Sequence, residues 1–338
     1  MLKAIVVDKD YGSVSIDKLE YIKSMYKKNG IQLELGHYKT EDEIIFACKE
    51  ADAILGTGNP PITRKVLEAL PNSKVILRFG IGVNSIDLKA VTETGKIALF
   101  MPGFCVDELA AHAASLILSL IRNTTYYDRG IRQGRWPKAT YFVPKNVSDL
   151  TLGLYGFGGS ARPLYEIFRK GFKTRVISCD PFLSEEVKKQ VDVEFVSFSE
   201  MLEQSDIISI HAPLTAETKH IFNKDSFKKM KNDAMIINIA RGELINEVDL
   251  IQALDNGEIR FAGLDVFEKE PIDSNNPLLK MDNVLLTCHS AFYGEKAQRN
   301  QIELAISLVK EALINKKIKK VYIANKDVIS KVNEFEYI

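Results

Sequence analysis

Short apolar runs alternate with longer stretches of helical periodicity along almost the whole chain. A strand buried on both faces reads as a continuous apolar run, whereas an amphipathic helix shows apolar residues three and four positions apart. The runs predict strands at residues 4–7, 32–35, 53–55, 74–78, 97–99, 151–155, 175–179, 207–210, 234–239, 261–264 and 284–287. Such alternation predicts an α/β fold of parallel sheets covered by helices.

Helical spacing predicts helices at residues 16–28, 41–49, 107–122 and 295–315. Helix 107–122 is apolar over most of its surface, which is typical of a helix buried in a large protein or against a partner. We therefore expect His112 to be a core or interface residue. The polar segment 126–149 contains two glycines and two prolines, so it is interpreted as a connection.

Composition and charge narrow the class of protein. A length of 338 residues favours two domains, and the formal net charge of zero argues against a nucleic-acid or membrane-surface partner. The four cysteines lack C-x-x-C spacing, so neither a disulfide framework nor a metal site is expected. No apolar run reaches the roughly 20 residues needed to span a bilayer. The N-terminus begins with a strand rather than a signal peptide, so a cytoplasmic protein is expected.

A glycine-rich turn follows the strand at 151–155. Gly156 permits a tight turn, Gly158 lets a pyrophosphate approach the backbone, and the small Ala161 allows close helix–strand packing. Asp180 ends the next strand, where it can accept hydrogen bonds from a ribose diol and repel a 2′-phosphate. The pattern predicts a site for NAD rather than NADP. The alternative is a turn shaped by packing alone.

Three polar groups follow three predicted strands near the C-terminus. They are Arg241, Glu270 and His289. An arginine can hold a carboxylate through two hydrogen bonds, and a histidine can carry a proton, with a neighbouring carboxylate favouring its charged form. The set suits proton-coupled reduction of a 2-oxo acid. The alternatives are a surface arginine, a solvated acidic turn and a structural histidine.

Six ordered motifs resemble the NAD-dependent D-isomer-specific 2-hydroxyacid dehydrogenases, and the resemblance covers nearly the whole chain. The motifs lie at residues 78–83, 156–161, 211–215, 238–242, 265–271 and 289–292. The resemblance implies a Rossmann NAD-binding domain at residues 103–292. It implies that this domain is inserted into a flavodoxin-like substrate domain made of residues 1–102 and 293–338.

The resemblance also implies roles for individual residues. Arg241, Glu270 and His289 would form the catalytic trio. The residues expected to bind the cofactor are Gly156, Gly158, Gly159, Ser160, Ala161, Asp180, His211, Ala212, Pro213, Thr218, Ile239, Ala240, Asp265 and His289, with Asp265 touching the nicotinamide carboxamide. The residues expected to bind the substrate are Arg78, Gly80, Ile81, Gly82, Gly58 and Arg241. The two glycines of residues 55–58 suggest room for a substrate side chain.

The chain departs from the family pattern in the glycine-rich turn. Relatives usually carry an arginine and an aliphatic residue where this chain has Gly159 and Ser160, so a lower cofactor affinity is expected. Cys288 replaces the usual proline before the histidine and is expected to be a small buried residue rather than a redox group.

The expected activity is reversible hydride transfer between NADH and a small 2-oxo acid, by a homodimer formed through helix 107–122. One alternative is an NAD(H)-sensing binding protein like the C-terminal-binding proteins, which segment 104–109 resembles. The other is a different enzyme on the same scaffold, a phosphoglycerate, glyoxylate, hydroxypyruvate, formate or phosphite dehydrogenase. The sequence leaves the identity of the acid open.

Overall fold

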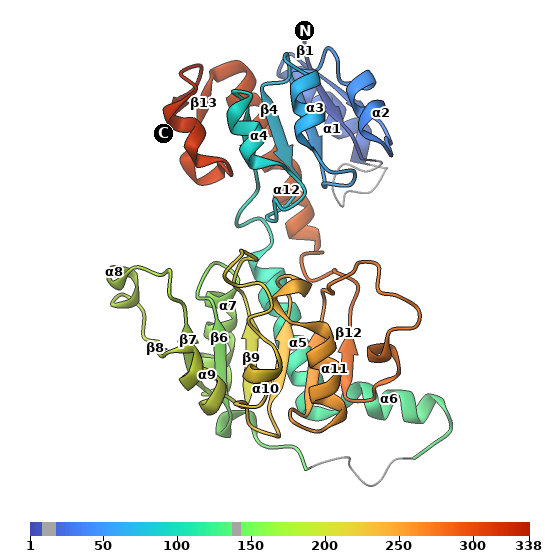
Figure 1. Ribbon diagram of the computed structural model, residues 1–338, viewed down its shortest axis with the longest axis vertical. Coiled ribbons are helices and arrows are strands. Elements are labelled where there is room, and N and C mark those ends of the chain that lie inside the picture. Colours follow the sequence, from blue (N-terminus) through green and yellow to red (C-terminus); the bar gives the residue numbers. More distant parts are fainter. Residues whose placement is uncertain (9–17, 137–142) are drawn as a thin grey trace. The chain divides into compact units, whose positions relative to one another are not determined.

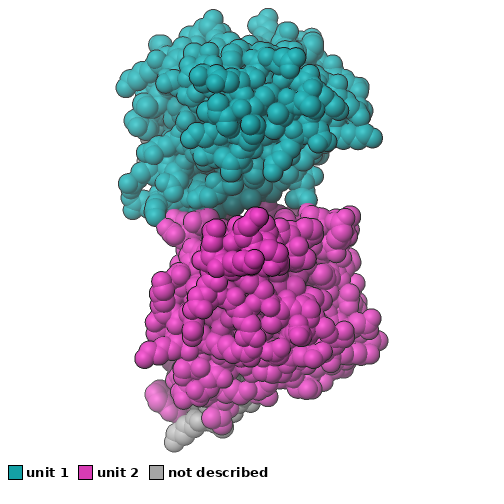
Figure 2. Space-filling model, turned by 90° about the vertical axis from the view of Figure 1, so that its left-hand side faces the viewer, with its two compact units in different colours: residues 1–105, 293–338 teal, residues 106–292 magenta. Residues whose placement is uncertain are grey.

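The chain divides into two compact units, residues 1–105 with 293–338 and residues 106–292 (Figure 1; the units are coloured separately in Figure 2). The computed structural model describes residues 1–8, 18–136 and 143–338. The second unit is therefore an insertion in the first, and its boundaries lie within a few residues of those expected from the sequence.

Unit 1 is built on a parallel sheet with the strand order β2-β1-β3-β4-β5. Its strands are β1 Leu2–Val6, β2 Ile31–Leu35, β3 Ala53–Gly56, β4 Val75–Arg78 and β5 Ile97–Leu99. Its helices are α1 Leu19–Lys28, α2 Glu41–Ala47, α3 Arg64–Ala69, α4 Leu88–Glu93 and α12 Glu295–Lys310, with α12 continuing as a π-helical turn, Glu311–Asn315. This strand order is that of flavodoxin-like sheets.

Unit 2 is built on a seven-stranded parallel sheet with the order β12-β11-β10-β9-β6-β7-β8. Its strands are β6 Thr151–Tyr155, β7 Arg175–Cys179, β8 Glu194–Phe195, β9 Ile207–Ile210, β10 Met235–Asn238, β11 Phe261–Leu264 and β12 Val284–Leu286. Its helices are α5 Val106–Arg122, α6 Thr124–Arg132, α7 Ala161–Glu166 with a π-helical continuation Ile167–Phe172, α8 Glu185–Lys188, α9 Phe198–Gln204, α10 Lys224–Phe227 and α11 Glu247–Asp255.

The order of strands in unit 2 is that of the Rossmann fold, with the direction of connection reversing between β6 and β9. Its core has two halves, one on each face of the sheet. Along β10, Ile236 packs with residues of α10 and α11, whereas Ile237 packs with residues of α5 and α7. Successive side chains of a strand point to opposite faces, so helices cover both faces of this sheet. The predicted α/β fold, a Rossmann domain inserted into a flavodoxin-like domain, is confirmed.

Two expectations about secondary structure need correction or restriction. The segment from residue 126 was expected to be a connection, but α6 continues to Arg132. The ion pair of Arg132 with Asp128, one turn apart at 2.8 Å, contributes to the stability of this mostly polar helix. The first residues of the helix expected at 16–28 lie outside the described residues, and α1 begins at Leu19.

Helix α5 packs against α7, β10 and β11 of its own unit, so its apolar surface is largely covered there. No helix in the described part of the chain is long and apolar enough to cross a membrane. Among the described residues there is also no group of three or more His, Cys, Asp or Glu side chains that could hold a metal ion.

Candidate active site

The three polar groups singled out in the sequence follow neighbouring strands. In the sheet, β10, β11 and β12 lie side by side, with Asn238 opposite Leu264 and Leu264 opposite Leu286. The segments that carry Arg241, Glu270 and His289 therefore leave the sheet at one edge. Ligands of open α/β sheets bind at this edge, outside the carboxyl ends of the strands.

His289 and Glu270 form a direct pair. Nδ1 of His289 lies 2.6 Å from Oε2 of Glu270, and the other carboxylate oxygen accepts a hydrogen bond of 3.1 Å from the Phe267 N–H. Burial alone would raise the pKa of Glu270, but the hydrogen bond and charge of His289, the Phe267 N–H and the charge of Arg241 together lower it. A charged carboxylate accepts from Nδ1 and leaves Nε2 of the imidazole for a substrate.

Asp265 holds the turn that carries His289. His289 adopts a left-handed conformation with φ of 52°, and its N–H donates to the Asp265 carbonyl at 2.7 Å. The Asp265 carboxylate accepts from Thr287 Oγ1 at 2.6 Å and from the N–H groups of Ser290 and Ala291, each at 2.9 Å. The residue is fully buried, and these four contacts fix the histidine turn. Contact with a nicotinamide stays a prediction for this residue.

The turn that carries Arg241 packs directly against the Glu270 segment. A Cβ atom on Gly242 would lie 1.9 Å from the carbonyl carbon of Phe267, so only glycine fits there. The Asn238 side chain shapes the same turn, because it accepts from the Ala240 N–H at 3.0 Å and donates to the Arg241 carbonyl at 2.7 Å. No local pattern in the sequence predicts this role of Asn238.

His112 and Cys288 lie close to this assembly. Nε2 of the half-buried His112 is 2.9 Å from Thr287 Oγ1, which itself donates to Asp265, so His112 is a packed polar residue of the core. Cys288 is exposed, and the expectation of a buried residue is wrong. It lies beyond the end of β12, where the left-handed turn at His289 directs the chain away from the sheet.

The glycine-rich turn lies at the point where the sheet reverses direction. Gly156 has φ of 91°, and a Cβ there would be 3.0 Å from the backbone nitrogen of Ala212 at the end of β9. A Cβ on Gly158 would meet no atom within 4 Å, so this part of the turn presents bare backbone to open space. Such a surface fits a dinucleotide pyrophosphate, and Ala161 is fully buried where α7 packs on the sheet.

Asp180 lies at the end of β7, beside the turn. One carboxylate oxygen accepts from the Phe157 N–H at 2.8 Å, and the other accepts from the Phe182 and Leu183 N–H groups at 3.0 and 3.1 Å. Each oxygen has two acceptor sites, so one site remains, on the oxygen that accepts from Phe157, and it can accept from one hydroxyl of a ribose while the carboxylate positions the turn.

His211 is a neutral histidine between two serines. Its Nδ1 lies 2.9 Å from Ser160 Oγ in the glycine-rich turn, and its Nε2 lies 2.9 Å from Ser209 Oγ in β9. Burial of the ring lowers the pKa of His211 to about 3. Sequence reasoning gave no role to Ser209, whose partner becomes visible only in the folded chain.

The other residues expected near the cofactor differ in accessibility. Thr218 is buried, and its hydroxyl donates to the Pro213 carbonyl at 2.8 Å and accepts from the Thr215 N–H, which closes this loop. Ile239 is buried directly after β10, whereas Ala240 and Ala212 are half-buried and Pro213 is exposed. Contact of these residues with a cofactor stays a prediction.

Unit 1 carries the residues expected to bind the substrate. Arg78 ends β4, and its Nη1 donates to the Phe79 carbonyl at 2.5 Å. Gly80 has φ of 143°, and its N–H and carbonyl make backbone hydrogen bonds to Arg78 and Met101. Among the described residues, the N–H groups of Ile81 and Gly82 meet no acceptor. Both N–H groups can therefore donate to a ligand.

The two glycines after β3 do not create room for a side chain. A Cβ on Gly58 would lie 1.9 Å from Ser85 Oγ, and a Cβ on Gly56 would lie 2.5 Å from Asp8 Oδ1. The expectation of space is therefore wrong, because close packing fills it. Burial raises the pKa of Asp8, whose carboxylate accepts from both the N–H and the hydroxyl of Thr57.

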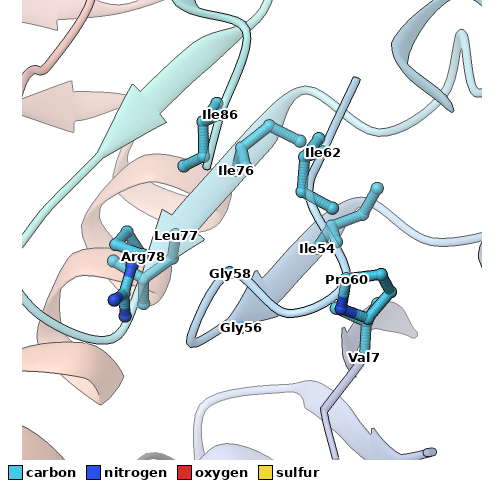
Figure 3. A pocket seen from close by; sticks show the side chains of 10 residues that line it. All are labelled: Val7, Ile54, Gly56, Gly58, Pro60, Ile62, Ile76, Leu77, Arg78 and Ile86. Carbon is cyan, nitrogen blue, oxygen red and sulfur yellow. The ribbon is translucent and has the colours of Figure 1, made fainter. Parts of the chain in front are cut away.

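Figure 3 shows what lies around these glycines. Aliphatic side chains surround a hollow of about 10 Å³, with Arg78 at one side; the lining residues are Val7, Ile54, Gly56, Gly58, Pro60, Ile62, Ile76, Leu77, Arg78 and Ile86. A hollow of this size holds about one water molecule and no alkyl chain.

Comparison with known proteins agrees with the fold. Residues 114–291 match the family model described as D-isomer specific 2-hydroxyacid dehydrogenase, NAD binding domain. The chain is 34% identical over 289 residues to a D-3-phosphoglycerate dehydrogenase of Archaeoglobus fulgidus, across 85% of this chain and 53% of that protein. It is 33% identical over 264 residues to a glyoxylate reductase of Korarchaeum cryptofilum, across 77% of this chain and 79% of that protein.

A solved structure of D-2-hydroxyisocaproate dehydrogenase superposes with a TM-score of 0.81 at 26% identity, covering 96% of this chain and 100% of that one. The chain spans about half the length of the Archaeoglobus phosphoglycerate dehydrogenase that it matches. The family resemblance of the six motifs is confirmed: this chain belongs to the D-isomer specific 2-hydroxyacid dehydrogenase family, and residues 114–291 match the NAD-binding domain of that family.

Proposed function

We propose that the protein is an NAD-dependent oxidoreductase that reduces a small 2-oxo acid to the D-2-hydroxy acid, and catalyses the reverse reaction. The observation that carries this proposal is the His289–Glu270 pair at 2.6 Å, in the unit that also holds Arg241 and the glycine-rich turn. Family membership supports the reaction class, because His289 and Glu270 lie in two of the six motifs that resemble this family.

Each residue of the trio has a distinct task. The guanidinium of Arg241 binds the substrate carboxylate and orients the carbonyl group. Bound NADH would supply the hydride to the carbonyl carbon. Nε2 of protonated His289 gives its proton to the carbonyl oxygen as negative charge develops there. Glu270 holds Nδ1 through the hydrogen bond and stabilises the charged imidazole. The overall change consumes one 2-oxo acid, one NADH and one proton, and it yields one hydroxy acid and one NAD⁺.

Asp180 supports a preference for NADH. Its carboxylate ends β7 beside the glycine-rich turn, in the position from which a carboxylate accepts from a ribose diol. A 2′-phosphate on the ribose would meet the negative charge of this group.

The substrate that we propose is compact, of the size of glyoxylate or hydroxypyruvate. In unit 1 the loop after β3 is closely packed by Ser85 and Asp8, so its two glycines add no space on their own side chain positions. Two relatives have names of this size class, a glyoxylate reductase and a hydroxypyruvate reductase, each 33% identical, whereas a 34% identical relative is named D-3-phosphoglycerate dehydrogenase.

The decisive experiment is NADH oxidation by the purified chain with glyoxylate, hydroxypyruvate, pyruvate, 3-phosphohydroxypyruvate and a branched 2-oxo acid, repeated with NADPH. We expect the highest kcat/KM with one of the first two acids and NADH, and a D-configured product where the product is chiral. Turnover of none of the five acids would overturn the enzyme proposal and leave the NAD(H)-sensing alternative. A preference for the branched acid would overturn the substrate class alone.

We also propose a homodimer that uses the segment after α5. Three apolar residues near this segment are strongly exposed: Ile131 at 49%, Trp136 at 77% and Val143 at 83%. Val143 also borders a hollow of about 180 Å³, whose other lining residues are Ile121, Leu150, Met235 and Phe261 together with the charged Lys145, Asp206, Asp233 and Arg260. Strongly exposed apolar side chains can contribute to an association surface. Light scattering should give twice the chain mass, and Trp136→Ala should shift the population toward monomer; a monomeric wild-type protein would overturn this proposal.

A further inference from the structure

A chain of three polar side chains links the sheet of unit 2 to the glycine-rich turn. Ser209 lies in β9, His211 follows the end of that strand, and Ser160 lies in the turn directly before α7. The imidazole joins the two hydroxyl groups, with 2.9 Å from Nε2 to Ser209 Oγ and 2.9 Å from Nδ1 to Ser160 Oγ. The question is which atom donates in each bond, because that decides what Ser160 offers to a ligand.

Ser209 determines the donor at its end of the chain. It is 0% exposed, and His211 Nε2 is the one partner of its side chain in the described part of the structure. If Nε2 carried the hydrogen, the Ser209 hydroxyl would accept that bond and its own hydrogen would be left without an acceptor. An unsatisfied buried donor is destabilising, so the Ser209 hydroxyl donates to Nε2.

The hydrogen of the neutral imidazole therefore resides on Nδ1. His211 stays neutral well below physiological pH, because burial lowers its pKa to about 3. Nδ1–H then donates to Ser160 Oγ, which acts as the acceptor in that bond. The Ser209 hydroxyl therefore donates to His211 Nε2, and His211 Nδ1–H donates to Ser160 Oγ.

The hydroxyl hydrogen of Ser160 is left for another group. The side chain does not cap α7, and in the described structure Ser160 Oγ has no partner besides His211. Its neighbours Gly158 and Gly159 are exposed and carry no side chain. A hydroxyl that already accepts one hydrogen bond is a stronger donor in the second, since chains of hydrogen bonds polarise one another.

The nearest cation along the turn is engaged elsewhere. Arg162 Nε donates to the Phe157 carbonyl at 3.4 Å, and its guanidinium lies over the Phe157 ring at 5.4 Å. The polar side chain that the turn itself presents between Gly159 and Ala161 is thus a neutral hydroxyl. Its natural partner is an acceptor-only group with negative oxygens, such as a phosphate diester.

We propose that Ser160, oriented by His211 and Ser209, is a phosphate-binding residue that donates its hydroxyl hydrogen to a pyrophosphate oxygen of the bound dinucleotide. The proposal rests on the proposed use of NAD(H). It gives His211 the task of a positioning residue, which acts on the cofactor through Ser160. Because His211 does not change its charge near neutrality, this contribution to binding is the same from pH 6 to pH 8.

The test is direct binding, measured by calorimetry with ADP-ribose and by fluorescence with NADH, with adenosine as the ligand that lacks the pyrophosphate. A hydrogen bond to a charged group contributes about 1.5–3 kcal/mol, so Ser160→Ala should weaken ADP-ribose and NADH roughly 10- to 100-fold. The affinity for adenosine, measured by its displacement of NADH, should stay unchanged.

Two substitutions of His211 distinguish loss of the hydrogen bond to Ser160 from loss of side-chain volume. The side-chain nitrogen of asparagine occupies nearly the place of Nδ1, whereas that of glutamine occupies nearly the place of Nε2. His211→Asn should therefore keep most of the ADP-ribose affinity, and His211→Gln should lose as much as Ser160→Ala. The double variant S160A/H211Q should lose no more than S160A alone, because both changes remove one contact.

Several outcomes contradict the proposal. Unchanged ADP-ribose affinity in S160A would overturn it, and equal loss of adenosine affinity would show that the variant only disturbs the turn. Additive losses in the double variant would overturn the link through His211. Failure of the wild-type chain to bind NADH and ADP-ribose at all would instead overturn the proposed use of the dinucleotide, so the two failures are distinguishable.

Discussion

Glu270 Oε2 accepts a hydrogen bond from His289 Nδ1 at 2.6 Å, and this contact joins two segments that leave adjacent strands of one sheet. A second pair in the same unit has nearly the same geometry. His220 Nε2 lies 2.7 Å from Glu268 Oε1, two positions from Glu270 in the chain. The second pair lies outside the proposed trio, so it supplies matched control variants for the first.

His289→Ala should lower kcat for reduction by roughly 10²–10⁴-fold, because it removes the proton donor. NADH binding, measured by fluorescence, should persist. His220→Ala removes a histidine of equal size and similar pairing, and it should keep most of the turnover. Near-normal turnover in His289→Ala would show that another group moves the proton.

Glu270→Gln should lower kcat for reduction. A neutral amide oxygen accepts a weaker hydrogen bond from His289 Nδ1 than the carboxylate does, so the imidazole is held less firmly for proton transfer. Glu268→Gln, at the second pair, should leave kcat unchanged. Equal kcat in the wild type and both variants would contradict the assigned role of Glu270.

Asp180→Asn should increase the use of NADPH relative to NADH. The change removes one negative charge, whose repulsion of a nearby phosphate is about 1 kcal/mol even in water, or roughly fivefold in the ratio of kcat/KM values. The amide oxygen can still accept from the Phe157 N–H, but the amide NH2 cannot accept from the Phe182 and Leu183 N–H groups, so the affinity for NADH is the control for the shape of this region. An unchanged ratio of kcat/KM with NADPH to kcat/KM with NADH would show that Asp180 does not contact the ribose 2′-position.

The sequence predicts the positions of the site because the relevant signals are local. The apolar runs place Arg241, Asp265 and His289 after three strands, and the glycine spacing places the nucleotide turn after β6. Contacts within the site depend on strand order instead. Ser160 contacts His211, which is 51 residues away in the sequence, and Thr287 contacts Asp265, which is 22 residues away. No periodicity along the chain predicts such pairs.

Helix α6 and the loop after β3 show where local signals mislead. Helix α6 is polar on average and contains Gly130, so its few apolar residues do not predict a helix clearly. Gly56 and Gly58 suggested open space, but a glycine marks a close approach as often as a void. The residues that approach Gly56 and Gly58 are Asp8 and Ser85, which belong to other segments of the chain.

Gly242→Ala should disrupt the site through sterics alone. Its Cβ would lie 1.9 Å from the Phe267 carbonyl carbon, so the Arg241 turn and the Glu270 segment must move apart. Overpacking of this kind costs about 1–3 kcal/mol or more, and activity should fall together with the midpoint of urea unfolding. Gly171→Ala is the control, since a Cβ there meets no atom within 4 Å and should change neither property. Wild-type stability and turnover in Gly242→Ala would contradict the packing described for this turn.

Lys96 should make the stability of the chain increase with pH in the alkaline range. The side chain is 1% exposed and donates to the Leu70 carbonyl at 2.8 Å. Burial, with a smaller effect of the Lys74 charge, lowers the pKa of Lys96 from 10.5 to about 8. Between these two values the unfolded chain binds the proton and the folded chain does not, so the free energy of unfolding increases with pH.

The measurement is urea unfolding of the wild-type protein and Lys96→Met at pH 7, 8.5 and 10. The difference between them should shift in favour of the wild type by up to roughly 3 kcal/mol as pH rises, since each pKa unit corresponds to about 1.36 kcal/mol. Other groups that titrate in this range are the same in both proteins, so their effects cancel in the difference. A constant difference over this range would mean that Lys96 keeps an ordinary pKa in the folded chain.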